Sequence, residues 1–63
     1  MALTLKAIRV NKGLNQKEAA KLLEITPETL CKWENGKTFP DVRNIKKIEK
    51  VYGVPYSEII FLP

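Results

Sequence analysis

The chain has 63 residues, and its 11 lysines and arginines against 7 aspartates and glutamates give a net charge of +4. A single cysteine cannot form an internal disulfide, and the lack of histidine removes the usual general base and a common zinc ligand. Composition therefore predicts one small domain with no metal and no cofactor, whose positive charge suits a polyanionic partner without requiring one.

Two helices are predicted in the first part of the chain, over about residues 4–12 and 16–23. Gly13 follows the first helix, as glycine commonly does at a helix C-terminus. Asn15 and Glu18 have the spacing of a capping box, which marks the start of the second helix. Leu5, Ile8 and Arg9 share one face of the first helix, and Ala19, Ala20 and Leu23 face inward from the second.

A third helix is predicted to run from Pro27 to Asn35, with Thr26 as its cap. Proline suits the first helical position, because the N–H that it lacks has no partner there. Only Glu24 and Ile25 separate the cap of this helix from the helix before it, and a link this short forces a steep crossing. This is the helix-turn-helix arrangement, whose second helix has the right width for the DNA major groove.

Two further helices complete the prediction. The fourth is expected over residues 42–52, between a Pro40-Asp41 start signal and Gly53. The fifth is expected over about residues 56–61, and no alternating pattern predicts a β-strand. We therefore expect an all-α domain of five helices that takes up residues 1–63. The apolar stripe of the fourth helix comprises Val42, Ile45, Ile48, Val51 and Tyr52.

Enzymatic and membrane functions are not expected. The three glycines stand far apart rather than in a phosphate-binding loop, and the acidic residues are scattered. A domain of short helices leaves little room for a closed small-molecule pocket. The sequence has no signal peptide and no apolar run approaching about 18 residues, so we expect a cytoplasmic protein without a membrane partner.

A set of motifs runs through the chain in a specific order and spacing. It comprises Arg9, Gly13-Leu14-Asn15-Gln16, Ala20, Ile25-Thr26, Leu30, Trp33-Glu34-Asn35-Gly36-Lys37, Gly53-Val54-Pro55 and Glu58-Ile59-Ile60. The chain thereby resembles, over nearly its whole length, the Xre family of phage and bacterial repressors, which is related to the lambda repressor and Cro proteins. The resemblance implies a compact lambda repressor-like fold that binds double-stranded DNA.

Glu24 departs from that family, which usually has glycine at this turn position. The residue at this position of the family often adopts a left-handed conformation. That conformation costs a residue with a Cβ on the order of 1 kcal/mol. We expect a slightly strained turn and an unchanged fold.

Four residues of the third helix are the expected base contacts: Pro27, Glu28, Thr29 and Lys32. Leu30 and Trp33 point inward, whereas the family's recognition helix presents these four positions to base edges. Lys32 suits the guanine acceptors, Glu28 a cytosine amino group, and the Thr29 methyl a thymine methyl. The alternative is an ordinary solvated face on which Glu28 and Lys32 form an i,i+4 ion pair.

A second set of residues is expected to hold the DNA backbone, by resemblance and by position near helix starts and the loop after the third helix. It comprises Gln16, Lys17, Thr26, Asn35, Lys37, Thr38, Arg43 and Asn44. For Lys46, Lys47 and Lys50 a solvated helix face is as good an explanation as a DNA contact. The resemblance gives Arg9 and Glu34 a structural role, as an ion pair that ties the first helix to the recognition helix. Trp33 is expected in the core, and Cys31 is expected to be an inert or weakly exposed thiol.

The end of the chain predicts a symmetric homodimer. Ile59, Ile60, Phe61 and Leu62 are consecutive apolar residues, and a short helix offers the core only one face. Some of them are therefore expected at a dimer interface. The alternative is that Ile59 and Leu62 fill the monomer core while the two residues between them are frayed.

Taken together, these features favour a sequence-specific DNA-binding transcriptional regulator, most simply a repressor that binds an inverted-repeat operator as a dimer. An alternative from another class is an antitoxin-type interaction module that also regulates its own operon. A third possibility is a helical scaffold that has lost DNA binding. Antitoxins usually carry an additional segment to cover the toxin, and almost none of this chain lies outside the predicted helices, which favours the simple repressor.

Overall fold

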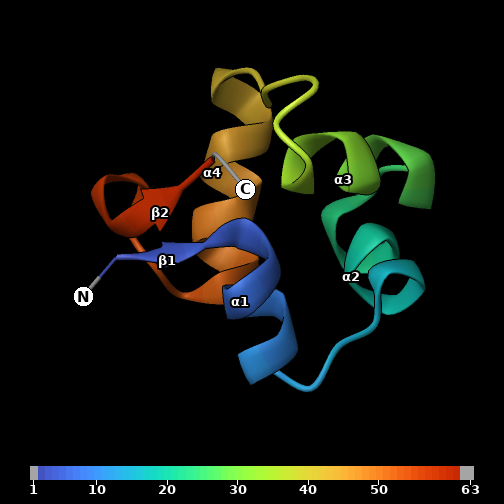
Figure 1. Ribbon diagram of the computed structural model, residues 1–63, viewed down its shortest axis with the longest axis horizontal. Coiled ribbons are helices and arrows are strands. Elements are labelled where there is room, and N and C mark those ends of the chain that lie inside the picture. The colour runs from blue at the N-terminus through green and yellow to red at the C-terminus, as the bar shows by residue number, and fades with distance from the viewer. Residues whose placement is uncertain (1, 62–63) are drawn as a thin grey trace.

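The computed structural model describes residues 2–61, which form four α-helices, one 3-10 turn and a two-stranded parallel sheet (Figure 1). In chain order the elements are β1 (Leu3–Thr4), α1 (Leu5–Asn11), α2 (Gln16–Leu23), α3 (Pro27–Glu34), α4 (Val42–Tyr52), η1 (Tyr56–Glu58) and β2 (Ile59–Ile60). None of the helices in this part of the chain is long and apolar enough to cross a membrane.

The four α-helices begin where short polar side chains cap them. Asn15 forms the full capping box with Glu18, its Oδ1 accepting the Glu18 N–H at 2.7 Å while Glu18 Oε1 accepts the Asn15 N–H at 3.1 Å. Thr4, Thr26 and Asp41 cap α1, α3 and α4 in the same way, through the N–H three residues on. Four of the five predicted helices are confirmed, and each begins where a cap satisfies an N–H group that the helix itself leaves unpaired. Thr4, expected as the first residue of its helix, is instead the cap of α1.

The predicted fifth helix is wrong, and so is the expectation that the chain has no strand. Residues 56–58 form a single 3-10 turn, after which β2 pairs in parallel with β1, with Leu3 opposite Ile59 and Thr4 opposite Ile60. A segment this short gains too few hydrogen bonds to offset helix nucleation, and β-branched isoleucines favour an extended backbone. The N-terminal strand supplies the backbone partner, from the other end of the sequence.

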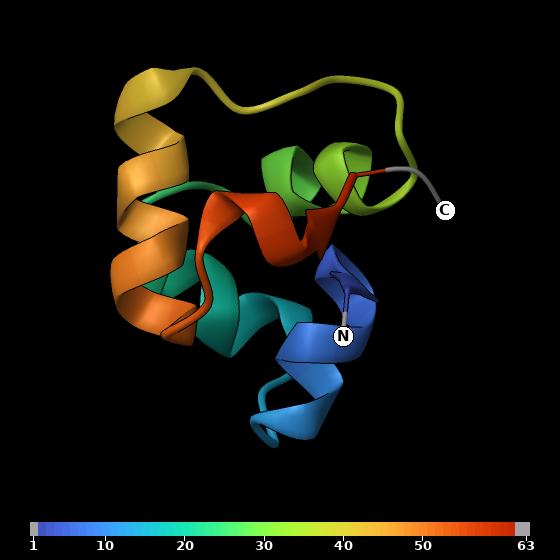
Figure 2. The ribbon, with the colours of Figure 1, turned by 90° about the vertical axis from the view of Figure 1, so that its left-hand side faces the viewer.

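The core lies where α1, α2, α3 and α4 meet β2. Its members are Leu5, Ile8, Ala19, Ala20, Leu23, Leu30, Trp33, Ile48, Tyr52 and Ile59. Ala19 and Ala20 are fully buried, so small side chains let α2 pack closely against both α3 and α4. The expected stripe of α4 is only partly internal, since Ile45 and Val51 are half-buried and Val42 is 69% exposed in the first turn. Figure 2 shows α4 running along one side of the molecule, with η1 and β2 beside it.

Candidate nucleic-acid interface

The start of α3 is held by paired threonines. Thr26 Oγ1 accepts the Thr29 backbone N–H at 3.2 Å, and the two hydroxyl groups lie 2.9 Å apart in a hydrogen bond. The Thr29 hydroxyl is thereby held toward Thr26 within the protein, and its methyl group is available for contact with an apolar atom.

The outer face of α3 carries three exposed residues, Pro27, Glu28 and Lys32, beside the half-buried Thr29. Leu30 lies on the opposite face in the core, as the sequence predicts. The two ion pairs found in residues 2–61 join other residues, so Glu28 and Lys32 do not form the i,i+4 pair of the alternative interpretation. Both charges are consequently available to an external partner.

The turn between α2 and α3 is left-handed at Glu24, with φ 60° and ψ 40°. Ile25 closes the turn by donating its N–H to the Ala20 carbonyl at 2.9 Å. This is the geometry expected at the position where the resembling proteins have glycine, and the carboxylate projects to within 3.8 Å of Lys47 Nζ on α4. The turn keeps its shape although the residue has a Cβ.

A buried polar network joins α1, α2 and α3 behind the outer face. Arg9 Nε donates to Glu34 Oε2 at 2.7 Å and Arg9 Nη2 to Glu34 Oε1 at 3.3 Å, while Arg9 Nη1 reaches the Leu14 carbonyl at 2.8 Å. Arg9 and Glu34 are both buried. A buried ion pair needs its remaining donors and acceptors satisfied, and the Leu14 carbonyl accepts from the Arg9 nitrogen that Glu34 leaves unpaired. The network fixes α1 and the loop before α2 against the last residue of α3.

Gln16 belongs to this network as well as to the expected backbone-contact set. Its Nε2 donates to Glu34 Oε1 at 3.0 Å, and the side chain is half-buried. A carboxamide has two N–H donors, so this bond leaves one of them, and the carbonyl oxygen, for another partner. The sequence offered no signal for the contact with Glu34, because the two residues meet only when α2 and α3 cross.

Tyr52 lies close to the network from the C-terminal end of α4. Its hydroxyl is buried and has no hydrogen-bond partner among the described residues. Burial raises the pKa of the Tyr52 phenol to about 12, the Glu34 carboxylate adds to the rise, and Arg9 opposes it. The sequence places Tyr52 only in the apolar stripe of α4, since the position of a residue around a helix does not indicate where its hydroxyl group lies.

The remaining candidates for backbone contact are spread over three places. Lys17 is exposed in the first turn of α2, Arg43 is exposed in the first turn of α4, and Asn44 beside it is half-buried. Between α3 and α4, the N–H groups of Lys37 and Thr38 both donate to the Lys32 carbonyl, at 2.9 and 3.4 Å. These backbone bonds hold the loop in place, while the side chains of Lys37 and Thr38 are exposed.

Asn35 is the C-cap of α3, and its amide Nδ2 donates to Cys31 Sγ at 3.2 Å. Cys31 is half-buried and is the only cysteine of the chain. The contact keeps the exposed Asn35 amide against its own helix, next to the loop that carries Lys37.

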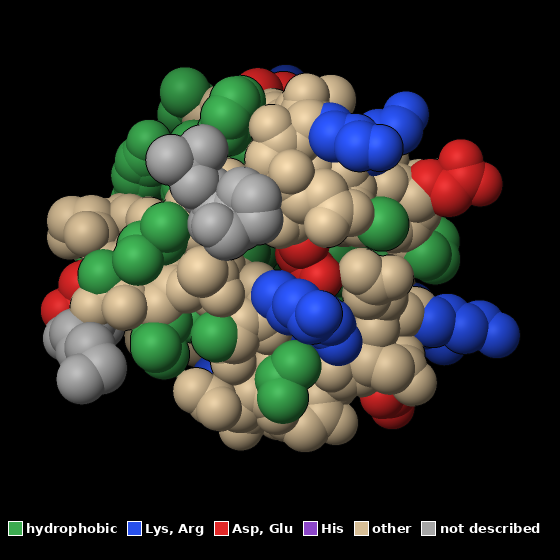
Figure 3. Space-filling model, viewed as in Figure 1, with side chains coloured by type: hydrophobic (Ala, Val, Ile, Leu, Met, Phe, Trp, Pro, Cys, Tyr) green, Lys and Arg blue, Asp and Glu red, His purple; other side chains and the backbone are tan. Residues whose placement is uncertain are grey.

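The C-terminal apolar residues divide among core and surface. Ile59 is buried, Ile60 is 41% exposed, and Phe61 is half-buried with its ring centroid 5.6 Å from that of Tyr56. Leu62 lies outside the described residues. In Figure 3 hydrophobic side chains gather on the side of β2 and the start of α4, whereas lysines and arginines project from the centre of this face and from the side that holds α2 and α3.

Comparisons with known proteins agree with this arrangement. The family described as helix-turn-helix matches residues 5–59. The chain is 32% identical over 56 residues to the HTH-type transcriptional activator BcrR of Enterococcus faecalis, covering 89% of this chain and 28% of that protein. It is 34% identical over 53 residues to the cryptic phage CTXphi transcriptional repressor RstR of Vibrio cholerae, covering 84% of this chain and 48% of that protein.

A third relative is the HTH-type transcriptional regulator PuuR of Escherichia coli strain K12, with 36% identity over 59 residues, or 94% of this chain and 32% of that protein. No solved structure matches at comparable significance. The chain thus spans between about a quarter and a half of the length of these curated relatives. What it shares with them is the helical segment that carries α2 and α3.

Proposed function

This chain belongs to the Xre family of helix-turn-helix transcriptional regulators, and from that premise we propose that it binds double-stranded DNA as a homodimer and represses transcription. The observation that carries the proposal is the exposed face of α3, where Glu28 and Lys32 have no ion-pair partner among residues 2–61 and lie beside the Thr29 methyl. On this proposal α3 enters the major groove.

Each of these side chains has a base edge that suits it. Lys32 donates to the O6 and N7 acceptors of guanine, and the Thr29 methyl packs against a thymine methyl. Glu28 accepts from a cytosine amino group, and it is repelled by the phosphates wherever no such donor meets it. Glu28 therefore contributes to specificity mainly by weakening binding to the wrong sequence.

Backbone contacts position α3. Lys17 and the free N–H of Gln16 stand at the start of α2, while Lys37 and Arg43 flank the loop that leads to α4. Contacts at both places grip two stretches of phosphate and set the depth of α3 in the groove. Because Gln16 also donates to Glu34, the phosphate that it holds is linked to the buried network.

The dimer is proposed to form through the C-terminal patch, defined as Tyr56, Ile60 and Phe61. Ile60 and Tyr56 are exposed apolar side chains, and Phe61 packs against the ring of Tyr56. Within residues 2–61 the sheet has two strands, so one backbone edge of β2 has no strand beside it, and a second copy can cover that edge. Two copies related by a two-fold axis then read two half-sites.

The test is selection of bound sequences from a random duplex pool. We expect an inverted repeat whose half-site centres lie about 34 Å apart, one turn of the double helix. Glu28→Ala should relax the selected sequence at one base pair of each half-site and leave the others unchanged. A pool that yields no preferred sequence, or a Glu28→Ala variant that selects the same site, would overturn this assignment.

The direction of regulation is tested separately. The selected operator is placed across a reporter promoter, where a bound dimer should lower transcription in proportion to operator affinity. RstR is named as a repressor and BcrR as an activator. The opposite result would be higher transcription when the operator lies upstream of the promoter, with no decrease in transcription when the operator overlaps the promoter. That result would make this chain an activator.

A further inference from the structure

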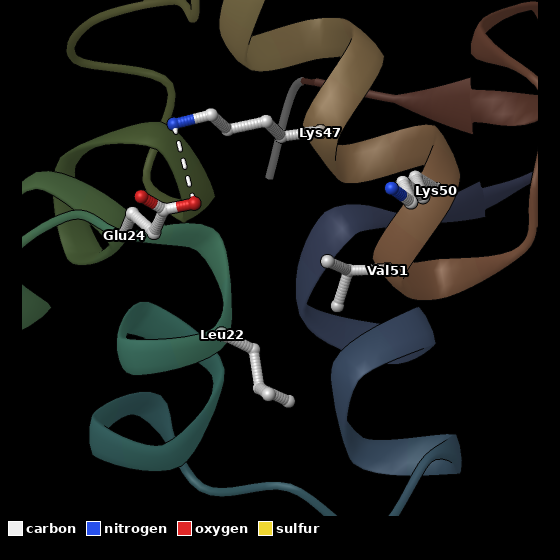
Figure 4. A pocket seen from close by; sticks show the side chains of 5 residues that line it. All are labelled: Leu22, Glu24, Lys47, Lys50 and Val51. Carbon is white, nitrogen blue, oxygen red and sulfur yellow. Dashed lines mark ion pairs between the residues drawn. The ribbon is translucent and has the colours of Figure 1, made fainter.

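A groove separates the C-terminal end of α2 from the C-terminal half of α4 (Figure 4). It has a volume of about 520 Å³ and is lined by Leu22, Glu24, Lys47, Lys50 and Val51. Leu22 and Val51 project into the gap from α2 and α4 and form its apolar floor. The two lysines and Glu24 form its rim.

The floor is apolar surface that the fold leaves uncovered. Leu22 is 54% exposed although it lies within α2, and Val51 is half-buried. Covering such side chains is favourable by about 25 cal/mol for each Å² removed from water. A molecule that binds here therefore needs an apolar side to reach the floor.

The rim is positive. Lys47 and Lys50 are three residues apart on α4, so their side chains leave the helix about 4.5 Å apart along its axis. Glu24 lies 3.8 Å from Lys47, but its side chain is 75% exposed and the pair is weak in water. Lys50 takes part in none of the ion pairs found in residues 2–61. A second carboxylate can replace Glu24 at little cost, and another can meet Lys50.

We propose that this groove binds an acidic, amphipathic helical segment of a partner protein. An amphipathic helix places apolar residues on one face, for Leu22 and Val51, and carboxylates one turn apart along an edge, for Lys47 and Lys50. A second copy of this chain is the less favourable occupant, because its net charge of +4 opposes the positive rim, whereas the proposed dimer forms through the uncharged C-terminal patch. Nucleic acid satisfies the lysines but leaves the apolar floor uncovered.

The probe is a fluorescein-labelled amphipathic peptide of about ten residues that repeats Asp-Glu-Leu-Leu. Its binding is measured by fluorescence anisotropy as the DNA-free chain is added. We expect saturable binding, and no binding of a peptide in which lysine replaces each acidic residue. Lys50→Glu should weaken binding by about tenfold or more, because it opposes a like charge to the peptide. Leu22→Ser should weaken it by about fivefold or more through loss of the apolar contact.

Lys46→Glu is the matched control, because Lys46 is an exposed lysine of the same helix that does not line the groove. It should change the dissociation constant less than about twofold, since it is farther from the peptide. An equal loss with Lys46→Glu would mean that only net charge is sensed, and would refute the proposal. Absence of saturable binding by the unmodified chain would do the same.

A second measurement is independent of any variant's folding. Methyl resonances of Leu22 and Val51 in the unmodified chain should shift when the acidic peptide is added, while those of Val10, which is exposed elsewhere, stay in place. Shifts confined to residues outside the groove refute the proposal. The proposal is also refuted if Lys50→Glu weakens binding to duplex DNA as much as Arg43→Ala does and leaves peptide binding unchanged. That result would assign the groove to DNA.

Discussion

The amide of Gln16, the first residue of α2, donates a hydrogen bond of 3.0 Å to the carboxylate of Glu34, the last residue of α3. Because Arg9 holds the same carboxylate from α1, three helices meet at one buried acid. The start of α2 and the end of α3 are thereby fixed to each other. In the proposed complex this bond sets the distance between a phosphate contact and the base-reading face.

Removing Arg9 should destabilise the fold strongly. Arg9→Met leaves Glu34 buried without its cation, which we expect to lower the free energy of unfolding by about 3 kcal/mol. Urea unfolding at neutral pH measures the loss. The control is the double variant Arg9→Met with Glu34→Leu, which removes both charges and should recover most of it. A single variant as stable as the unmodified chain would show that the ion pair is not structural.

Replacing Glu24 by glycine should stabilise the domain. At φ 60° the Cβ of Glu24 is strained, and glycine removes a cost on the order of 1 kcal/mol. The ion pair with Lys47 that is lost in exchange is exposed and weak. Thermal unfolding should show a higher Tm for Glu24→Gly, whereas Glu24→Ala, which loses the same ion pair and keeps a Cβ, should not. Equal behaviour of the two variants would contradict strain at this turn.

Tyr52 should make stability depend on alkaline pH. Its pKa in the folded chain is about 12 against a usual value of 10.0, so the folded state keeps a proton that the unfolded chain releases. The contribution of the protonated Tyr52 to the free energy of unfolding is complete below pH 10 and should be lost as the pH rises from 10 to 12. Tyr52→Phe should flatten this part of the profile.

At neutral pH the same variant should be about as stable as the unmodified chain, or more stable by up to about 1 kcal/mol, because the buried hydroxyl has no partner to lose. Urea unfolding at a series of pH values gives both results. A loss of several kcal/mol on Tyr52→Phe at neutral pH would show that the hydroxyl is bonded.

Arg43 is expected to neutralise one phosphate of the operator. Affinity should then fall with salt by a slope of about −0.9 for each phosphate contacted, and Arg43→Ala should reduce that slope by about one unit. Titrations of the selected operator at several salt concentrations measure it. Lys6→Ala removes an exposed lysine of α1 and serves as the control. An unchanged slope with Arg43→Ala would remove this residue from the interface.

Ile60→Glu should break the proposed dimer with less damage to the fold than a change at Phe61, because Ile60 is exposed whereas Phe61 packs against the core. We expect weaker binding to the inverted repeat and unchanged binding to nonspecific duplex. Stoichiometry on the operator, by analytical ultracentrifugation, gives two protomers for the unmodified chain. One protomer per operator, or normal operator binding by Ile60→Glu, would rule out the dimer.

The sequence by itself determined the four α-helices and the turn between α2 and α3. Caps such as Asn15 and Thr26 act on N–H groups only three residues away, and apolar spacing selects the inner face, so both signals are local. The left-handed conformation of Glu24 was implied by the resemblance to the Xre family, which usually has glycine at this position. Which side chains of α3 touch DNA stays a prediction, since it depends on a partner as well as on the fold.

Only the tertiary structure decided the rest. The end of the chain becomes strand β2 rather than a helix because Leu3–Thr4, from the opposite end of the sequence, offers it a backbone to pair with. Gln16 meets Glu34, and Tyr52 lies near them, because α2, α3 and α4 cross there. The groove of Leu22 and Val51 has the same origin. A pattern along the chain records the face on which a residue lies, whereas the residue across from it depends on how whole helices pack.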